Sequence, residues 1–273
     1  MFFSKSRSLI VGAALAVAAY AAPAAAATCG NNAAGFGNWL EAFKREAAAA
    51  GISEKAISAS LNGVSYDAKV IQLDRSQKSF KLSFDQFYKR RVNNAMIAKG
   101  RQLMKTHAKT IAAIEKRYGV PGEVVIAIWG LETGYGGNSG SMPVMRSLAT
   151  LAYDCRRSDF FTNELMSALR IVQRGDMTPS QMRGAWAGEL GQTQFLASSY
   201  VKFGVDFDGN GRVDLIRSVP DVLGSTANYL KAYGWRPGGW DAGSGNYNVL
   251  RQWNKAEVYV KTISVMASKI AGN

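Results

Sequence analysis

Histidine and cysteine are scarce in this chain of 273 residues, which contains one histidine, His107, and two cysteines, Cys29 and Cys155. A Ser-His-Asp triad and a histidine-based metal site each need a histidine beside further functional groups, but His107 lies among lysines. No zinc-ligand spacing and no glycine-rich phosphate loop is present. The sequence therefore argues against zinc sites, triad hydrolases and phosphate-loop nucleotide binding.

A long apolar run is also missing. The apolar stretch at 9–22 is shorter than the roughly 20 residues that a membrane span needs. It follows Lys5 and Arg7 and precedes small residues at 24–27, so residues 1–27 are predicted to be a cleavable signal peptide. We expect an exported, periplasmic protein with no transmembrane segment.

The two cysteines fit an exported protein with one candidate disulfide, Cys29 with Cys155, although sequence leaves the pairing open. Cys29 also raises the alternative of a lipid anchor just after the cleavage site. Position 26 is Ala and not a large aliphatic residue, and position 28, directly before Cys29, is Thr and not the small Gly or Ala that such sites favour, so a lipoprotein form is not expected.

Acidic residues are outnumbered, with 20 Asp and Glu against 33 Lys and Arg and a net charge of +13. An excess of this size favours a polyanionic partner. The chain shows no aromatic RNA-binding signature and no clear recognition helix, so no nucleic acid partner is expected. An anionic wall polymer or membrane surface is favoured, and the alternative is that most of these lysines only aid solubility.

Helical periodicity dominates what is present, and 47% of the residues are apolar, so a mainly α globular chain with few short strands is predicted. Residues 28–35 are expected to be a linker, 64–73 to be extended, and 136–143 and 237–248 to be loops. An aromatic stripe, Phe80, Phe84, Phe87 and Tyr88, is expected to pack in the core. Helices are expected at 36–50, 53–61, 121–132, 147–153, 159–174, 221–233 and 250–270, and one or two helices at 92–118.

One helix, within the stretch from Tyr118 to Tyr135, is apolar almost throughout, which predicts burial on all sides. It closes on a single carboxylate, Glu132, next to glycines at 134, 136 and 137. Apolar surroundings disfavour the charged form of a carboxyl and raise its pKa, which suits a general acid. The alternative is a helix-end Glu whose side chain reaches solvent.

A second motif, residues 206–214, matches the first nine positions of a calcium-binding EF loop. Oxygen-bearing side chains occupy positions 1, 3, 5 and 9, and glycine occupies position 6, where the loop turns sharply. Position 12 is Arg217 and not Glu, so the standard bidentate ligand is missing, although Asp221 could close a longer loop. A structural calcium site is favoured over an Asx-rich turn without metal.

Several motifs in this order resemble the lytic murein transglycosylases of the membrane-bound lytic transglycosylase B type. The resemblance covers nearly all of 36–270. The matching segments are Leu73-Asp74-Arg75-Ser76-Gln77, Tyr118-Gly119-Val120-Pro121, Ala127-Ile128-Trp129-Gly130-Leu131-Glu132-Thr133, Ser147-Leu148-Ala149-Thr150-Leu151-Ala152, Ala187-Gly188-Glu189-Leu190-Gly191-Gln192-Thr193-Gln194-Phe195, Val219-Pro220-Asp221 and Ser225-Thr226-Ala227-Asn228-Tyr229.

The resemblance implies a lysozyme-like fold over 36–273 and cleavage of the β-1,4 bond between N-acetylmuramic acid and N-acetylglucosamine in peptidoglycan. Glu132 matches the single catalytic Glu, which protonates the glycosidic oxygen and then accepts the proton of the muramic acid 6-hydroxyl. That hydroxyl attacks the anomeric carbon of its own sugar, leaving a 1,6-anhydro end, so no second carboxylate is needed. The alternatives are a hydrolytic muramidase, with Glu189 or Asp154 as second carboxylate, and a non-catalytic peptidoglycan-binding protein.

The resemblance also assigns residues to the substrate cleft. Gln194, Tyr229 and Tyr259 match cleft residues, and Trp253 stands where the family often has Tyr, so a stacking surface is kept and a phenol donor is lost. Ala185 stands where some members have a ligand-contacting Ser. The remaining expected cleft residues, from the 187–195 motif, are Gln192 and Glu189.

For calcium, the matching ligands are the side chains of Asp206, Asp208, Asn210 and Asp221 and the carbonyl of Arg212, in a loop spanning 206–221. No cofactor for catalysis is expected. A monomer that binds peptidoglycan glycan strands is predicted.

Overall fold

The computed structural model describes residues 28–77 and 82–272. The expected signal peptide at 1–27, and Phe80 of the aromatic stripe, lie outside the described residues. In the part described, no helix is long and apolar enough to cross a membrane.

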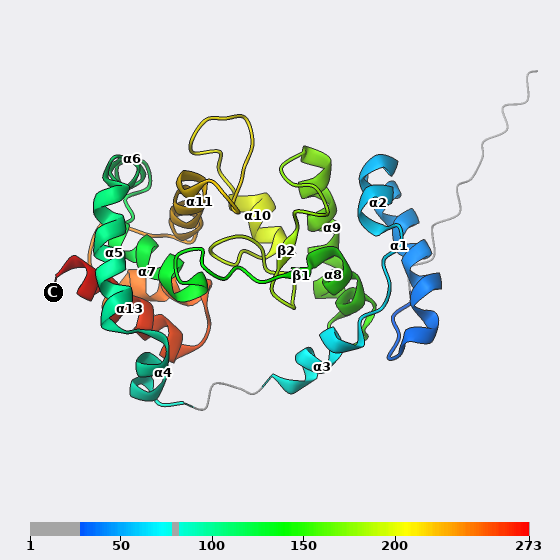
Figure 1. Ribbon diagram of the computed structural model, residues 1–273, viewed down its shortest axis with the longest axis horizontal. Coiled ribbons are helices and arrows are strands. Elements are labelled where there is room, and N and C mark those ends of the chain that lie inside the picture. Colours follow the sequence, from blue (N-terminus) through cyan, green and yellow to red (C-terminus); the bar gives the residue numbers. More distant parts are fainter. Residues whose placement is uncertain (1–27, 78–81, 273) are drawn as a thin grey trace, which may run out of the picture.

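The architecture is mainly helical, as predicted, with the helices gathered towards the two ends of an elongated molecule (Figure 1). One end holds η1 (Ala33–Gly35), α1 (Phe36–Ala49), α2 (Glu54–Leu61), α3 (Ala68–Ser76), α8 (Val144–Tyr153) and α9 (Ser158–Arg174). The other end holds α4 (Phe84–Arg91), α5 (Asn94–Thr106), α6 (Ala108–Tyr118), α7 (Gly122–Thr133), α11 (Val219–Ala232), α12 (Gly245–Trp253) and α13 (Glu257–Ala271).

Between the two ends lie α10 (Ala197–Phe203) and a two-stranded antiparallel sheet of β1 (Met142–Pro143) and β2 (Arg183–Gly184). Met142 pairs with Gly184, and Pro143 pairs with Arg183. These short strands join the loop after α7 to the segment before α10, so they bring parts of the chain from both ends together.

Helix α7 is the buried centre of its end of the molecule. Every residue from Val124 to Leu131 is buried, because α5, α6, α11 and α13 pack around it. The helix ends at Gly134, whose φ of 62° lies in the left-handed region that glycine adopts without strain. Glu132 therefore occupies the last turn of a helix that the core holds rigidly.

Two segments differ from the sequence prediction. Residues 64–73, expected to be extended, contain most of α3, because the Asp67 side chain accepts a hydrogen bond from Lys69 N and begins a helix there. The single helix expected at 250–270 is two helices, α12 and α13. The chain breaks at Asn254, whose Oδ1 accepts a hydrogen bond from Ala256 N.

The segment expected to be a linker is instead docked on α8. Gly30 N donates a hydrogen bond to Tyr153 O, and Cys29 is joined to Cys155 by a disulfide. Gly30 allows this approach, since a Cβ there would lie 2.1 Å from the Tyr153 hydroxyl oxygen. The pairing that sequence left open is thus present in the structure, and it fixes residues 28–35 to the end of α8.

Candidate active site

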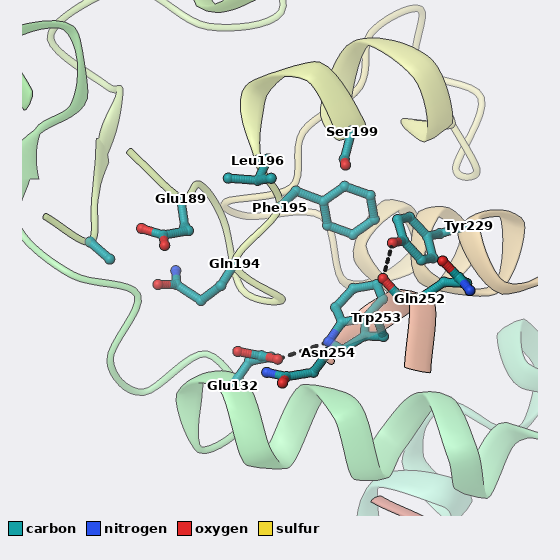
Figure 2. Close-up of a pocket in the computed structure, with 11 residues that line it drawn as sticks. Glu132, Glu189, Gln194, Phe195, Leu196, Ser199, Tyr229, Gln252, Trp253 and Asn254 are labelled. Carbon is teal, nitrogen blue, oxygen red and sulfur yellow. Dashed lines mark hydrogen bonds between the residues drawn. The ribbon is translucent and has the colours of Figure 1, made fainter. Parts of the chain in front are cut away.

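Glu132 projects from the last turn of α7 into a cavity of about 390 Å³. Figure 2 shows its carboxyl group beside Trp253, with Glu189 and Gln194 on one side of the cavity and Tyr229 on the other. The cavity is lined by Glu132, Ala185, Glu189, Gln194, Phe195, Leu196, Ser199, Tyr229, Gln252, Trp253 and Asn254. The structure thus brings together residues that are far apart in sequence around one carboxyl group.

Two donors converge on one oxygen of that carboxyl group. Trp253 Nε1 donates to Glu132 Oε1 at 2.8 Å, and the Tyr259 hydroxyl donates to the same oxygen at 2.7 Å. Within the described residues, Oε2 has no hydrogen bond and is not among the buried unpartnered atoms, so it is accessible from the cavity. This arrangement leaves Oε2 as the oxygen able to carry a proton towards a ligand.

The surroundings favour the protonated form of Glu132. Burial raises the pKa of its carboxyl group above the ordinary value, the hydrogen bonds from Trp253 and Tyr259 and the charge of Arg91 lower it, and the charge of Glu189 raises it. The overall direction is upward, because loss of hydration outweighs the two hydrogen bonds. A carboxyl group that holds its proton more tightly than usual suits general acid catalysis.

Arg91 is a contributor that the sequence did not reveal. As the last residue of α4, it donates from Nη2 to the carbonyl oxygen of Leu131 at 2.7 Å, one residue before Glu132. Nothing in the local pattern of α4 predicts this contact, since it depends on how α4 packs against α13, beside α7.

Trp253 also makes a contact that the sequence did not reveal. The phenol of the family's Tyr was expected to be lost at this position, and the sequence did not show that the indole N–H would donate to Glu132 in its place. Its ring lies edge-on to Phe195 and Tyr229, with centroid distances of 5.4 and 5.0 Å. The Tyr229 hydroxyl donates to Gln252 O at 2.6 Å, so Tyr229 lines the cavity and also fixes the end of α12 that carries Trp253.

The two glutamines of the 187–195 motif have different surroundings. Gln194 lines the cavity with a φ of 52°, and its Nε2 donates to the carbonyl oxygens of Ser139 and Gly191. Gln192 was expected to contact substrate, but its amide is engaged within the protein. Its Oε1 accepts from Trp129 Nε1, its Nε2 donates to Ile216 O, and it does not line the cavity. Gln192 therefore joins α7 to the segment before α11.

Glu189 is a second carboxyl group in the same cavity. Its Oε2 is buried and has no hydrogen-bond partner among the described residues. Burial raises the pKa of the Glu189 carboxyl group, and the charge of Glu164 raises it further, while backbone hydrogen bonds and Arg157 lower it. By contrast Asp154, the other candidate second carboxylate, accepts hydrogen bonds on both oxygens from Arg75 Nη2 and does not line the cavity.

Asn254, Phe195, Leu196, Ser199 and Gln252 line the cavity and were not predicted. Asn254 was placed inside a continuous helix, where its side chain would have had no special role. In the structure, Asn254 lies at the break between α12 and α13, and this break is what places it in the cavity. The sequence did not reveal the break.

The EF-type loop lies outside the cavity, between α10 and α11. Carboxylate oxygens of Asp206, Asp208 and Asp221 lie within 4.8 Å of one another. Asp221 is fully buried, and its two oxygens accept hydrogen bonds from Phe207 N, Asp208 N and Asp214 N but face no cation in the described chain. Converging carboxylates without a counter-charge fit a hard divalent cation.

The other loop positions are less uniform. Asn210 Oδ1 accepts from Arg212 N at 3.1 Å. Asp214, at position 9, pairs with Arg212 Nη2 at 3.0 Å and accepts from Ile216 N and Arg217 N. Asp214 is therefore committed to the loop itself, which agrees with its omission from the expected ligand set.

Comparison with known proteins identifies the family. The family model described as "Transglycosylase SLT domain" matches residues 35–243. Membrane-bound lytic murein transglycosylase B of Escherichia coli (strain K12) is 40% identical over 122 residues, which is 44% of this chain and 34% of that protein. The match thus spans about a third of the length of this curated relative.

Solved structures agree in fold. SltB3 from Pseudomonas aeruginosa, in complex with NAG-anhNAM-pentapeptide, has a TM-score of 0.82 at 31% identity, covering 87% of this chain and 80% of that one. The Escherichia coli lytic transglycosylase Slt35 in complex with calcium has a TM-score of 0.77 at 22% identity, covering 90% and 96%. Because the family model matches residues 35–243, which are most of this chain, the chain belongs to the transglycosylase SLT domain family.

Proposed function

We propose that this protein is a lytic transglycosylase that cleaves the β-1,4 bond between N-acetylmuramic acid and N-acetylglucosamine in peptidoglycan glycan strands. The observation that carries the proposal is the carboxyl group of Glu132, whose Oε1 accepts two hydrogen bonds and whose Oε2 is accessible from the cavity. Its family relatives, and the NAG-anhNAM-pentapeptide in the SltB3 complex, support the same substrate class.

Glu132 acts first as acid and then as base. Oε2 gives its proton to the glycosidic oxygen, so the N-acetylglucosamine side leaves as an alcohol. The carboxylate then accepts the proton of the muramic acid 6-hydroxyl, whose oxygen bonds to the anomeric carbon of the same sugar. The proton count on Glu132 is restored, and because the nucleophile is intramolecular, proximity supplies much of the rate.

Three side chains are proposed to hold the substrate around this centre. Gln194 offers an amide oxygen that has no hydrogen bond to the described protein, and Asn254 offers an amide beside Glu132. Trp253 presents an aromatic ring to the sugar while its N–H orients Glu132.

Glu189 is proposed as an acceptor for a substrate N–H or O–H group, because its buried Oε2 lacks a partner. An unpaired buried acceptor is unfavourable, and a bound ligand would relieve it. The same residue favours the second candidate function, a hydrolytic muramidase in which Glu189 activates water. The two functions differ in their products.

A structural calcium ion is proposed in the EF-type loop, held by Asp206, Asp208 and Asp221, with Asn210 and the Arg212 carbonyl completing the set. Calcium would neutralise the three converging carboxylates there. The structure of the Escherichia coli Slt35 in complex with calcium has the same overall fold.

A soluble exported form is proposed for this protein. Cys29 is in a disulfide, so its sulfur is not available to a thioether-linked lipid, and disulfides persist in oxidising compartments such as the bacterial periplasm. The Escherichia coli relative is described as membrane-bound, and this proposal separates the two proteins in that respect.

The test is digestion of purified sacculi, with the soluble products weighed by mass spectrometry. Products lighter by one water than hydrolytic muropeptides carry 1,6-anhydro ends and support the transglycosylase. Products with reducing ends would support the muramidase. A wild-type protein that binds sacculi but releases nothing would leave only the binding role, and the variant Glu132→Gln should bind sacculi without releasing products.

A further inference from the structure

Positive charge is concentrated in a short part of the chain. Residues 84–118 contain nine basic and two acidic residues, an excess of seven out of the net +13 of the whole chain. These residues form α4, α5 and α6, which lie at one end of the molecule with α13 (Figure 1).

The exposed cations of residues 84–118 form no ion pair with a carboxylate of the described residues. At the other end, Arg75, Arg156 and Arg157 pair with the buried carboxylates of Asp74 and Asp154. We define the basic face by six exposed cations of α4, α5 and α13, none of which forms an ion pair with a described carboxylate. They are Lys89, Arg90, Arg101, Lys105, Lys261 and Lys269.

Side-chain contacts join these helices into one surface. Lys261 Nζ lies 4.3 Å from the ring centroid of Phe84, and Lys269 Nζ lies 5.2 Å from that of Tyr88. Arg101 Nη2 donates to the carbonyl oxygen of Lys269 at 2.6 Å, so α5 meets α13 there. Two further members, Lys89 and Arg90, follow directly after Tyr88, and Lys105 lies one helical turn beyond Arg101.

Helix α4, which carries part of the basic face, is connected to Glu132 through buried side chains, although no residue of the face lines the cavity. The ring of Phe87 on α4 lies 5.9 Å from that of Tyr259, which donates to Glu132. Arg91, next to Arg90, donates to Leu131 O. A polymer that extends beyond the cavity on the α4 side of Glu132 would pass over the basic face.

The composition of the face indicates which polyanion it binds. Proteins that lie on membranes insert apolar side chains beside their basic ones. Among the described residues the exposed large apolar side chains are Phe160 and Tyr233, and neither is on α4, α5 or α13. Charge without apolar anchors fits a hydrated, carboxylate-bearing polymer better than a lipid bilayer.

We propose that the basic face binds the carboxylates of the stem peptides on the peptidoglycan strand whose glycan occupies the cavity. This inference rests on the proposed function. The face acts as a tether that keeps the enzyme on the wall between cleavage events, and it adds affinity for cross-linked wall without contributing to bond cleavage.

The test compares two triple variants that each remove three positive charges. Lys89→Gln, Arg90→Gln and Lys105→Gln alter the basic face at side chains that make no hydrogen bond or ion pair to described residues. Arg45→Gln, Lys55→Gln and Lys69→Gln alter exposed cations on α1, α2 and α3 that form no ion pair with a described residue, and they serve as the matched control. Melting temperatures establish that both are folded.

Binding to intact sacculi is measured by sedimentation at low temperature, and turnover is measured on soluble glycan strands from which an amidase has removed the stem peptides. We expect the basic-face variant to bind sacculi about tenfold more weakly and to lose most of the salt dependence of binding. The basic-face variant should turn over bare glycan strands at the wild-type rate. The control variant should match the wild type in both sacculus binding and turnover.

Equal weakening of sacculus binding in both variants would overturn the proposal, because net charge would then govern binding. No weakening in either variant would also overturn it, because neither set of charges would then matter. Loss of turnover on bare strands by the basic-face variant would show that these residues support the cavity. Wild-type binding to vesicles rich in anionic lipid but not to sacculi would assign the face to a membrane. A wild type inactive on every glycan would instead refute the proposed function.

Discussion

Trp253 Nε1 lies 2.8 Å from Glu132 Oε1, across a separation of 121 residues in sequence. With the Tyr259 hydroxyl on the same oxygen, this contact fixes which side of the carboxyl group faces the protein and which faces the cavity. Both donors stabilise the carboxylate, while burial destabilises it, so the protonation of Glu132 reflects a balance that single substitutions can shift in either direction.

Trp253→Phe should move the alkaline limb of the pH–rate profile to higher pH. The variant keeps an aromatic ring but removes a donor that lowers the pKa of Glu132, so the acid stays protonated to higher pH. The maximal rate should fall by roughly tenfold, because the carboxyl group is less well oriented. Tyr259→Phe should shift the limb in the same direction, and an unchanged limb in both variants would exclude Glu132 as the titrating acid.

Glu189→Gln should shift the same limb in the opposite direction. The charge of Glu189 raises the pKa of Glu132, so an uncharged amide of the same shape lowers that pKa. The loss of activity on the alkaline side of the profile therefore begins at a lower pH than in the wild type. The products should still carry anhydro ends, and activity at acidic pH should be retained within about tenfold. Complete loss of activity with reducing-end products in the wild type would instead identify Glu189 as the base of a muramidase.

The placement of Glu132 in the cavity was predictable because its signal is local. An apolar helix, a single Glu in its last turn and a left-handed glycine at 134 occur within one continuous stretch, and the structure places Glu132 in the cavity. The α2 start at Ser53 was predictable for the same reason, since the capping residue and the helix it begins are neighbours.

The donors to Glu132 and the break that positions them were not fully predictable. The apolar periodicity at 250–270 continues through Asn254, so the break between α12 and α13 depends on a side-chain turn and on packing against α7. The indole N–H of Trp253 replaces the lost phenol as a donor to Glu132, which the sequence did not reveal because it does not show which edge of the indole meets Glu132. Arg91 reaches the site only through the packing of α4.

Glu132→Gln should raise thermal stability while lowering the rate by at least about 100-fold. Burial raises the pKa of Glu132 in the folded state, so its contribution to stability is present below the ordinary value of 4.5 and is lost as pH rises through the raised value. Glutamine removes that loss. The melting temperature should therefore exceed the wild type's at neutral and alkaline pH by about 2–4 °C for each kcal/mol regained. The difference should vanish near pH 4, and an increase independent of pH would contradict this origin.

Removing the disulfide should destabilise the end of the molecule distant from Glu132. Cys29 and Cys155 close a loop with a sequence separation of 126, so replacing both by Ser should lower the free energy of unfolding by about 2–4 kcal/mol. Activity at low temperature should be retained, since neither residue lines the cavity. A reductant should lower the melting temperature of the wild type but not of the double variant, and equal responses would show that the bond is not formed in solution.

Calcium should stabilise the protein without taking part in the reaction. The buried Asp221 and its neighbours Asp206 and Asp208 gather negative charge that a cation would offset, so a chelator should lower the melting temperature. A ligand present at about 100 times its dissociation constant contributes about 2.7 kcal/mol, which is roughly 5–10 °C for a protein of this size. Asp206→Asn should abolish most of the difference in melting temperature between calcium and chelator. Asp241→Asn, which alters an exposed Asp outside the loop, should leave that difference unchanged.

Because the loop lies outside the cavity, product formation at low temperature should be the same with calcium and with chelator. A rate that falls with chelator at temperatures where the protein stays folded would contradict a purely structural role.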